Sequence, residues 1–418
     1  MIVAGGTQDV QFEYFGHQST CSITSGQTVE LQPDLASGRS RRIVMISDFC
    51  SAVPPELICG PVGEDKAPCV PVAQPIVTGG YLERLPMAVV AAGMADVAEV
   101  WSFSGRDTDW TGVRLMPSAM PERRFRADPQ PAPYRSDAML SHIRRFGAPD
   151  ILCVLGLGVE EDILVACAES IRIYNSIDAP ALRVPDRISR HFDIVLTGSA
   201  AQSADVLKRH PDVIVDILPI GPEFASPLTF RPLHLPPIYD VIYVAAAQPY
   251  KRHHMLFDAL HRLPRHIRTL CVIGYGELAE TLQQEARARG LNIDFIGPPG
   301  VSHDAVNTLM NLARMGVVCG VDDGAPAILT EYMLAGLPVL ANAGLCCGVQ
   351  YIFDQTGRTS TEAHFHQGIA DMLADLSTFS PRETVLANWT WPHSVKQFAS
   401  LIQQARAQRG KASGGGAA

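Results

Sequence analysis

The sequence predicts an α/β protein with two domains, each built on a parallel sheet with helices on both faces. Three observations support this fold class. The chain has 418 residues, which is too long for a single hydrophobic core. Short apolar runs typical of buried parallel strands alternate with helical patterns along most of it. A proline-rich stretch from Pro227 to Pro237 separates two such alternating regions and is typical of a linker.

The composition fits a soluble globular enzyme, with 47% hydrophobic and 18% charged residues. The formal net charge of −9 argues against a general nucleic-acid-binding protein. No apolar run approaches the ~20 residues of a membrane span, and the start of the chain lacks the features of a signal peptide. The basic group Arg123 to Arg126 is either a solvated loop or a weak contact with a membrane surface.

Ten cysteines are scattered through the chain without a C-x-x-C pair, which is typical of a protein in the reducing cytoplasm. Cys153, Cys271 and Cys319 lie in apolar runs and are predicted to be core residues. The adjacent pair Cys346-Cys347 is predicted to serve packing rather than redox chemistry. The thirteen histidines are dispersed, and no metal-ligand spacing is present. Nothing in these patterns indicates the oligomeric state.

Residues 1–40 are predicted to be an N-terminal extension, and residues 41–225 the first domain. The first strand is expected at 43–48. A long loop rich in Pro and Gly follows and ends at Gly79-Gly80, before a helix expected at 81–92. Such a Gly pair allows the backbone to approach an oxyanion closely. Further strands are expected at 97–103, 150–155, 171–176, 193–198 and 212–220, helices at 136–146 and 199–209, and an irregular segment at 107–133.

A linker at 226–238 is expected to lead into a second domain at 239–390. Its elements are again expected to alternate, with Lys251-Arg252 opening the first helix. Gly274-Tyr275-Gly276 opens the second helix. Strands are predicted at 239–244, 269–273 and 292–296, and helices at 251–263, 278–289 and 303–314.

The most informative stretch begins with a short buried strand at 315–319 and continues through two acids, a glycine and a proline to a helix expected at 327–335. Gly336 is predicted to end that helix, and Pro338 opens the next strand. Such a loop leaves backbone N–H groups at a helix start, where phosphate or sugar oxygens bind well. Asp323 lies at the mouth of the loop and Glu331 about two helical turns later.

Asp323, Glu331 and the Gly336-Leu337-Pro338-Val339 segment resemble the donor-site signature of retaining glycosyltransferases of the GT-B architecture, in particular family 4. The first acid is usually Glu in that family. The order of elements across the second domain is also similar to the family's donor domain. The resemblance implies two Rossmann-like domains flanking a cleft. It also implies the transfer of a hexosyl group from a nucleotide diphosphate sugar with retained anomeric configuration. The acceptor would be a glycan, a lipid-linked sugar or a small molecule, and the reaction would belong to glycan biosynthesis or be related to it.

The resemblance also implies roles for individual residues. Lys251 would neutralise the donor diphosphate with Arg252 beside it, Asp323 would hold the donor sugar, and Glu331 would accept hydrogen bonds from the ribose hydroxyls. No cofactor or metal is expected, because Lys251 can neutralise the leaving group. The further donor-side residues are Gly324, Ala325, Pro326 and Ala327 at the sugar and phosphates, Ile296 and Gly297 at the base, and Gly79 and Gly80 facing the diphosphate.

The resemblance also implies that a helix at 391–410, after the Trp389 segment, crosses back to the first domain; residues 411–418 are expected to be a flexible tail. The family's Gly-Arg pair ahead of the lysine is replaced here by Ala245-Ala246, and the usual first-domain histidine is missing. Asn175 and Asp178 are the candidates for the acceptor side.

These departures leave two alternatives open. Either Arg252 or a residue elsewhere compensates for the missing arginine, with weaker diphosphate binding if none does, or the protein binds a nucleotide sugar without turning it over. A third alternative, a nucleotide-dependent oxidoreductase, rests on Gly274-Tyr275-Gly276. That motif lacks the third glycine of the dinucleotide fingerprint.

Overall fold

The structure is a computed structural model that describes residues 8–14, 17–23, 40–51, 77–104, 112–116, 118 and 120–414. The first 39 residues form a unit of their own, in which β1 (Gln8–Tyr14) and β2 (His17–Ile23) make an antiparallel pair. Most of the long loop predicted after the first strand, residues 52–76, lies outside the described residues.

The first large sheet has eight strands in the order β10-β9-β8-β7-β3-β4-β6-β5. All neighbours pair in parallel except β5 with β6. The chain starts near the middle at β3 and builds outward in both directions, as in a doubly wound sheet. The strands are β3 (Arg42–Ser51), β4 (Val97–Ser104), β5 (Gly112–Leu115), β6 (Pro121–Arg126), β7 (Ile151–Leu155), β8 (Ile171–Asn175), β9 (Ile194–Thr197) and β10 (Ile214–Ile217).

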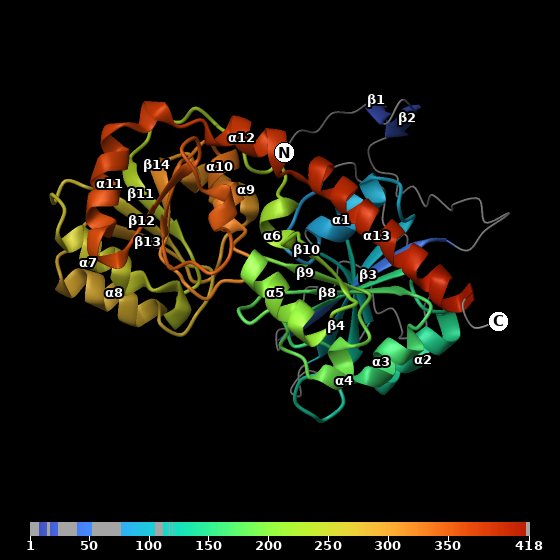
Figure 1. Ribbon diagram of the computed structural model, residues 1–418. Coiled ribbons are helices and arrows are strands. Elements are labelled where there is room, and N and C mark those ends of the chain that lie inside the picture. Colours follow the sequence, from blue (N-terminus) through green and yellow to red (C-terminus); the bar gives the residue numbers. More distant parts are fainter. Residues whose placement is uncertain are drawn as a thin grey trace. The chain divides into compact units, whose positions relative to one another are not determined.

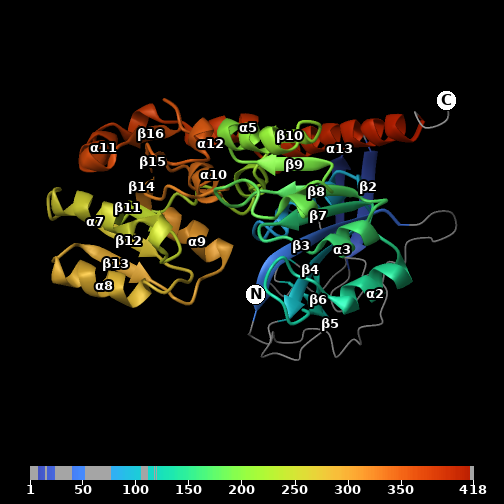
Figure 2. The ribbon, with the colours of Figure 1, turned by 60° about the horizontal axis from the view of Figure 1, so that its bottom comes forward.

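Helices cover both faces of this sheet, because its strands carry apolar side chains on both sides. One core is formed with α1 (Arg84–Ala91) and α13 (Trp391–Gly414). The opposite core contains residues of α2 (Asp137–Phe146), α3 (Glu161–Ala166), α4 (Asp186–Ser189) and α5 (Ala200–Arg209). Figure 2 shows α13 on one side of these strands and α2 and α3 on the other.

The second sheet is entirely parallel, with strand order β13-β12-β11-β14-β15-β16. Its strands are β11 (Tyr239–Val244), β12 (Thr269–Val272), β13 (Ile293–Ile296), β14 (Ala313–Val318), β15 (Val339–Asn342) and β16 (Gly357–Ser360). One face packs against α7 (His253–His261), α8 (Ala279–Ala288) and α11 (Phe365–Ala374). The other packs against α9 (His303–Met310), α10 (Ile328–Leu334) and α12 (Pro381–Asn388), as Figure 1 shows.

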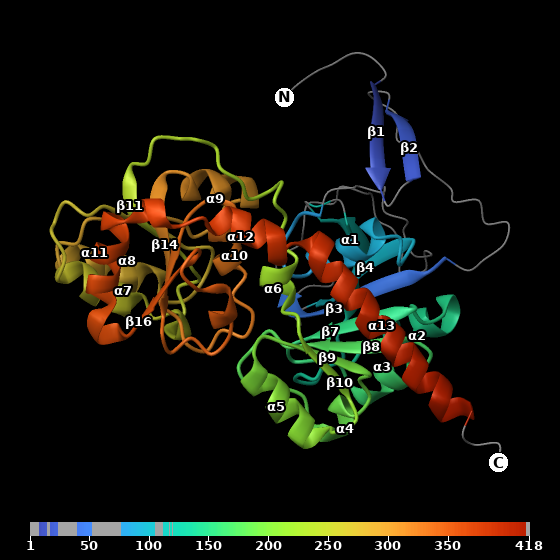
Figure 3. The same cartoon turned by 45° about the horizontal axis from the view of Figure 1, so that its top comes forward.

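The last helix, α13, returns to the first sheet. Phe398 and Ile402 are buried in the same core as strands of that sheet. Near its end, Arg409 binds Asp193 at 2.6 Å. Figure 3 shows α13 lying across these strands. The predicted crossover of the C-terminal helix is therefore confirmed. The helix extends to Gly414, past Lys411, where the sequence predicted a flexible tail; residues 415–418 are not described.

The segment 107–133, predicted to be irregular, contains β5 and β6 at the edge of the first sheet. Arg123 and Arg124 of this segment are buried, whereas Arg126 is exposed. Arg123 pairs with Glu99 at 3.1 Å and Arg124 with Glu122 at 3.2 Å, and all four side chains are buried. Buried charges need such partners. The prediction of a solvated loop or a membrane contact is therefore wrong for Arg123 and Arg124.

Two predicted helix boundaries also differ. Lys251 ends a short 3₁₀ turn, η1 (Pro249–Lys251), and Arg252 adopts a left-handed conformation with φ 51°, so α7 starts only at His253. The helix predicted at 303–314 ends at Met310 because β14 already begins at Ala313. In spite of these differences, Lys251 and Arg252 still follow β11, as predicted.

Candidate active site

Lys251 and Asp323, 72 positions apart, form an ion pair beyond the carboxyl ends of β11 and β14. Both side chains are largely buried, with 18% and 12% exposure. Tyr243 holds the lysine in place by donating its hydroxyl to the Lys251 carbonyl at 2.5 Å. Burial opposes the charge of Lys251, but Asp323 and Tyr250 together raise its pKa above the ordinary lysine value. The site therefore contains a permanently protonated cation at neutral pH.

The loop around Asp323 is in backbone contact with two loops of the first sheet. Asp323 forms an antiparallel bridge with Asp178, which follows β8. Gly324 is required by this approach, since a Cβ there would lie 2.5 Å from the Asp178 backbone. A Cβ on Gly198, which follows β9, would lie 2.1 Å from the Gly324 carbonyl oxygen. The structure thus brings the predicted sugar-binding Asp323 and the predicted acceptor-side Asp178 together.

Glu331 lies on α10 and is only 8% exposed. Its Oε1 accepts a hydrogen bond from Nη2 of Arg84, which comes from α1 in the first domain, 247 positions away. Arg84 also donates from Nε to the Gly79 carbonyl at 3.0 Å and from Nη1 to the Gly221 carbonyl at 2.9 Å. Sequence reasoning missed Arg84. Its position four residues after Gly80 was the only signal, and that signal does not point to Glu331.

The Gly79-Gly80 turn is the predicted oxyanion loop, and the chain itself supplies a carboxylate to it. The Gly80 N–H donates to Oε2 of Glu83 at 2.8 Å. Oε1 of Glu83 accepts from the Ser118 hydroxyl at 3.4 Å. Glu83 is 7% exposed. An anion at this N–H would therefore have to displace Glu83.

The remaining predicted donor residues lie at the same edge of the second sheet. Arg252 pairs with Glu362 at 2.6 Å, not with Asp323 or Glu331. The Ile296 carbonyl accepts the Ile273 N–H at 2.8 Å in the strand ladder, and Gly297 follows with φ 84°. Ala325 donates its N–H to Oδ1 of Asp323 at 3.4 Å, which orders the start of the loop. Asp323 is thus in contact with both Lys251 and Ala325, whereas the Arg252 side chain points to Glu362.

On the first-sheet side, Asn175 ends β8 and is completely buried, and neither its Oδ1 nor its Nδ2 has a hydrogen-bond partner among the described residues. Such an orphan amide in a native protein calls for an additional partner, such as a water or a ligand. Three residues later, Asp178 pairs with Arg183 at 3.2 Å, and its carbonyl accepts from Gln202 at 2.7 Å. These contacts fix the loop that carries both predicted acceptor-side residues.

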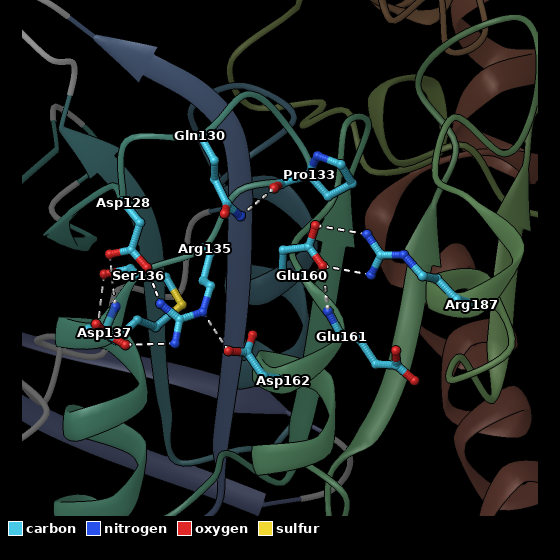
Figure 4. Close-up of polar contacts among 11 residues, drawn as sticks. Asp128, Gln130, Pro133, Arg135, Ser136, Asp137, Glu160, Glu161, Asp162 and Arg187 are labelled. Carbon is cyan, nitrogen blue, oxygen red and sulfur yellow. Dashed lines mark hydrogen bonds and ion pairs between the residues drawn. The ribbon is translucent and has the colours of Figure 1, made fainter.

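A network of charges orders the loops after β6 and β7 (Figure 4). Arg135 binds Asp137 and Asp162, each at 2.7 Å, and also Asp128. These three carboxylates raise the pKa of Arg135 above its ordinary value. The neighbouring Glu160 binds Arg187 through two bonds of 2.6 and 2.9 Å. The network ties the segment before α2 to the start of α3, and it was not foreseen because its members are dispersed over three segments.

Two adjacent cysteines face different parts of the site. Cys346 Sγ donates to the Asp323 carbonyl at 3.4 Å, whereas Cys347 Sγ donates to the Ser199 hydroxyl of the first domain at 3.6 Å. Cys347 is buried and Cys346 partly exposed. The prediction that this pair serves packing agrees with these contacts.

The joint between the two sheets contains a buried carboxylate, Glu223, in the short helix α6 (Ile220–Glu223). Tyr351 and Ser394 each donate a hydroxyl to it at 2.8 Å. Burial raises the pKa of Glu223 to about 7, although both hydroxyls act in the opposite direction. The joint therefore contains a group that titrates near neutral pH.

Residues 236–379 match the family model described as glycosyl transferases group 1. The second sheet and its helices therefore form a domain that is similar to group 1 glycosyl transferases. Lys251, Asp323 and Glu331 all lie within this domain. Gly274 to Gly276 lie within it too, which argues against the oxidoreductase alternative. A sequence search of curated proteins gave no match.

Solved structures share the whole architecture. Sucrose-phosphate synthase from Thermosynechococcus elongatus aligns with a TM-score of 0.63 at 17% identity, over 88% of this chain and 100% of that one. HepE of Anabaena, in complex with UDP and glucose, gives 0.60 at 15% identity, over 87% and 100%. The lipopolysaccharide outer core galactosyltransferase WaaB gives 0.56 at 13%, over 87% and 99%. The fold around the group 1 glycosyl transferase domain is therefore the predicted GT-B fold.

Two further findings concern membrane-spanning helices and metal ligands. In the part of the chain that the structure describes, no helix combines the length and apolarity needed to cross a bilayer. Within the same residues, no three His, Cys, Asp or Glu side chains are grouped so that they could hold a metal ion.

Proposed function

We propose that the protein transfers a hexosyl group from a nucleotide diphosphate sugar to an acceptor with retention of the anomeric configuration. The observation that carries the proposal is the meeting of Lys251 and Asp323 within a domain that matches group 1 glycosyl transferases. A protonated lysine next to the sugar-holding acid can stabilise the leaving diphosphate as the glycosidic bond breaks. Because Lys251 provides this charge, the proposed reaction needs no metal.

Three further groups have proposed roles in this reaction. Glu331 receives the ribose hydroxyls, since a largely buried carboxylate is a strong acceptor. The backbone from Gly324 to Ala327 contacts the sugar and phosphates, and Ile296 and Gly297 contact the base. Asn175 supplies its unpartnered amide to the acceptor, as supported by its complete burial without a hydrogen bond.

Donor binding in this proposal requires that the two sheets separate locally. The backbone contact of Asp178 with Asp323 occupies the space between the loops, and Glu83 occupies the Gly80 N–H. A donor sugar between these loops replaces those contacts with its own. The complexes of HepE with UDP support a nucleotide site in this fold.

The first test is thermal stabilisation by UDP, GDP, ADP and their hexose conjugates. A ligand at ten times its Kd should stabilise the native state by about 1.4 kcal/mol. Lys251→Met and Asp323→Asn should lower transfer by ~100-fold or more, the usual loss when a transition-state contact is removed. Arg289→Met removes the surface ion pair between Arg289, just after α8, and Asp258 on α7. This variant is the matched control and should change neither binding nor transfer. NMR of the product's anomeric proton reports retention or inversion.

A second candidate is a protein of this fold that binds a nucleotide sugar without transferring it. Two observations favour this candidate. Ala245-Ala246 replaces the family's Gly-Arg pair, and Glu83 occupies the Gly80 N–H. The two candidates separate cleanly in the same experiment. Stabilisation by a nucleotide sugar without hydrolysis or transfer to any acceptor would support the second, and failure of all three nucleotides to stabilise the protein would contradict both.

A further inference from the structure

Arg84 is a fully buried cation that belongs to the first domain but ends at the proposed nucleotide site. It is 1% exposed. Its three nitrogens each have a different partner: the Gly79 carbonyl, the Gly221 carbonyl and Glu331. These partners lie in the glycine turn, in the joint and on α10. One side chain therefore connects three segments that must all be in place for the site to exist.

Among the described residues, Glu331 is the only carboxylate that forms an ion pair with Arg84. Glu331 itself is 8% exposed, so its negative charge needs a buried partner to remain in this position. Arg84 binds Oε1, which leaves Oε2 with its lone pairs for another donor. The planar guanidinium, fixed at its other two nitrogens, also sets the orientation of the carboxylate.

The other two cations of the site have different carboxylate partners. Lys251 pairs with Asp323 and Arg252 with Glu362. Among the residues that the structure describes, neither forms an ion pair with Glu331, and Ala245-Ala246 provides no cation. Charge compensation of Glu331 thus comes from across the domain joint.

We propose that Arg84 is the positioning residue for ribose recognition: it holds the Glu331 carboxylate in the orientation in which Oε2 accepts the ribose hydroxyls. Nucleotide affinity then depends on a first-domain residue, and the ribose is recognised fully only when α1 and α10 are together. This inference rests on the proposed function, since it assigns Glu331 to the ribose. It differs from a purely structural role for Arg84 because it makes the effect specific to the ribose hydroxyls.

The experiment compares UDP, GDP and ADP with their 2′,3′-dideoxy counterparts by calorimetry, on the full chain and on Arg84→Met, Arg84→Lys and Glu331→Gln. In the native chain the loss of the hydroxyls should weaken binding by ~10-fold or more, the value of hydrogen bonds to a charged group. In Arg84→Met and Glu331→Gln the ratio of the Kd of the dideoxy nucleotide to that of the parent nucleotide should fall to about twofold or less. Arg84→Lys, which keeps a buried cation, should be intermediate and replaces the Met variant if the latter does not fold.

Arg123→Met is the matched control, because Arg123 on β6 is as buried as Arg84 and pairs with Glu99 of the first sheet, not with Glu331. It should keep the native ratio. If the native chain discriminates the ribose and the Arg84 variants discriminate it equally well, the inference is wrong while the proposed function stands. If the native chain binds none of the three nucleotides, the proposed function itself fails and the inference with it.

Discussion

Two ion pairs define the proposed donor site, and they differ in where their partners come from. Lys251 and Asp323 both belong to loops of the second sheet. Arg84 and Glu331 join the first domain to the second. The first pair retains some exposure, 18% and 12%, whereas the second is nearly closed off, at 2% and 10%. The comparison indicates that the second domain pairs Lys251 with Asp323 by itself, whereas Glu331, the proposed ribose acceptor, depends on the first domain for its partner.

The largest effect is expected on stability when either pair is broken. Arg84→Met leaves the Glu331 charge buried without a partner and should lower the free energy of unfolding by about 3–5 kcal/mol. Lys251→Met should cost less, roughly 1–3 kcal/mol, because Asp323 keeps a second hydrogen-bond donor, the Ala325 N–H. Urea unfolding of both variants measures the difference.

The double variant Arg84→Met with Glu331→Leu is the control for this first prediction. Removing both charges should restore most of the lost stability, since apolar residues replace a buried pair at little cost. Equal losses in the Lys251 and Arg84 variants would show that the two pairs are equivalent and would remove the basis of the comparison.

A smaller effect is expected from Glu223, which also makes contacts across the joint. Its pKa is raised from 4.5 to about 7 by burial. The folded state therefore holds this proton more tightly than the unfolded state does. The free energy of unfolding should fall as pH rises from about 4.5 through 7, by roughly 3 kcal/mol in total. Glu223→Gln should remove this slope in denaturation measured across that range.

The control for Glu223 is Glu362→Gln, since Glu362 pairs with Arg252 at the exposed rim, with 48% of its side chain accessible. It should leave the slope of stability against pH unchanged. A slope that persists in Glu223→Gln would show that Glu223 is not the group responsible for it.

The same contrast between local and cross-domain contacts explains how much the sequence could predict. The strand–loop–helix pattern around Asp323 was visible because strand, turn and helix signals lie within a few residues of one another. The ion pair of Lys251 with Asp323 was not predicted, although each residue follows a predicted strand of the second domain. β5 and β6 were missed because the run Arg123-Arg124 appears solvated until Glu99 and Glu122 are placed beside it.

Arg84 and Glu83 could not be predicted for a related reason. Both follow the Gly79-Gly80 turn, and the sequence gives no indication that one turns back onto the Gly80 N–H while the other reaches Glu331 on α10. Local periodicity specifies which face of a helix is apolar. It does not specify which polar residue at the helix start meets another domain, because that depends on the joint at 219–223.

The smallest expected effect is on thiol labelling, which distinguishes a contact within the second domain from a contact between the two domains. Cys346 contacts Asp323 of its own domain, whereas its neighbour Cys347 contacts Ser199 of the first. A hydrogen bond with Cys347 lowers the pKa of Cys346, and the same contact together with burial raises the pKa of Cys347. Iodoacetamide should therefore modify Cys346 first, as read by peptide mass spectrometry, because the thiolate is the reactive form.

Labelling of Cys347 then reports separation of the two domains, because its sulfur is covered by the loop at Gly198 and Ser199. In Arg84→Met, which removes the cross-domain pair, the rate at Cys347 should rise while the rate at Cys346 stays nearly constant. Buried Cys153, inside the first sheet, is the internal control for general unfolding and should remain unmodified in both proteins. A parallel increase at all three cysteines would instead show that Arg84 supports the fold as a whole rather than the contact between the domains.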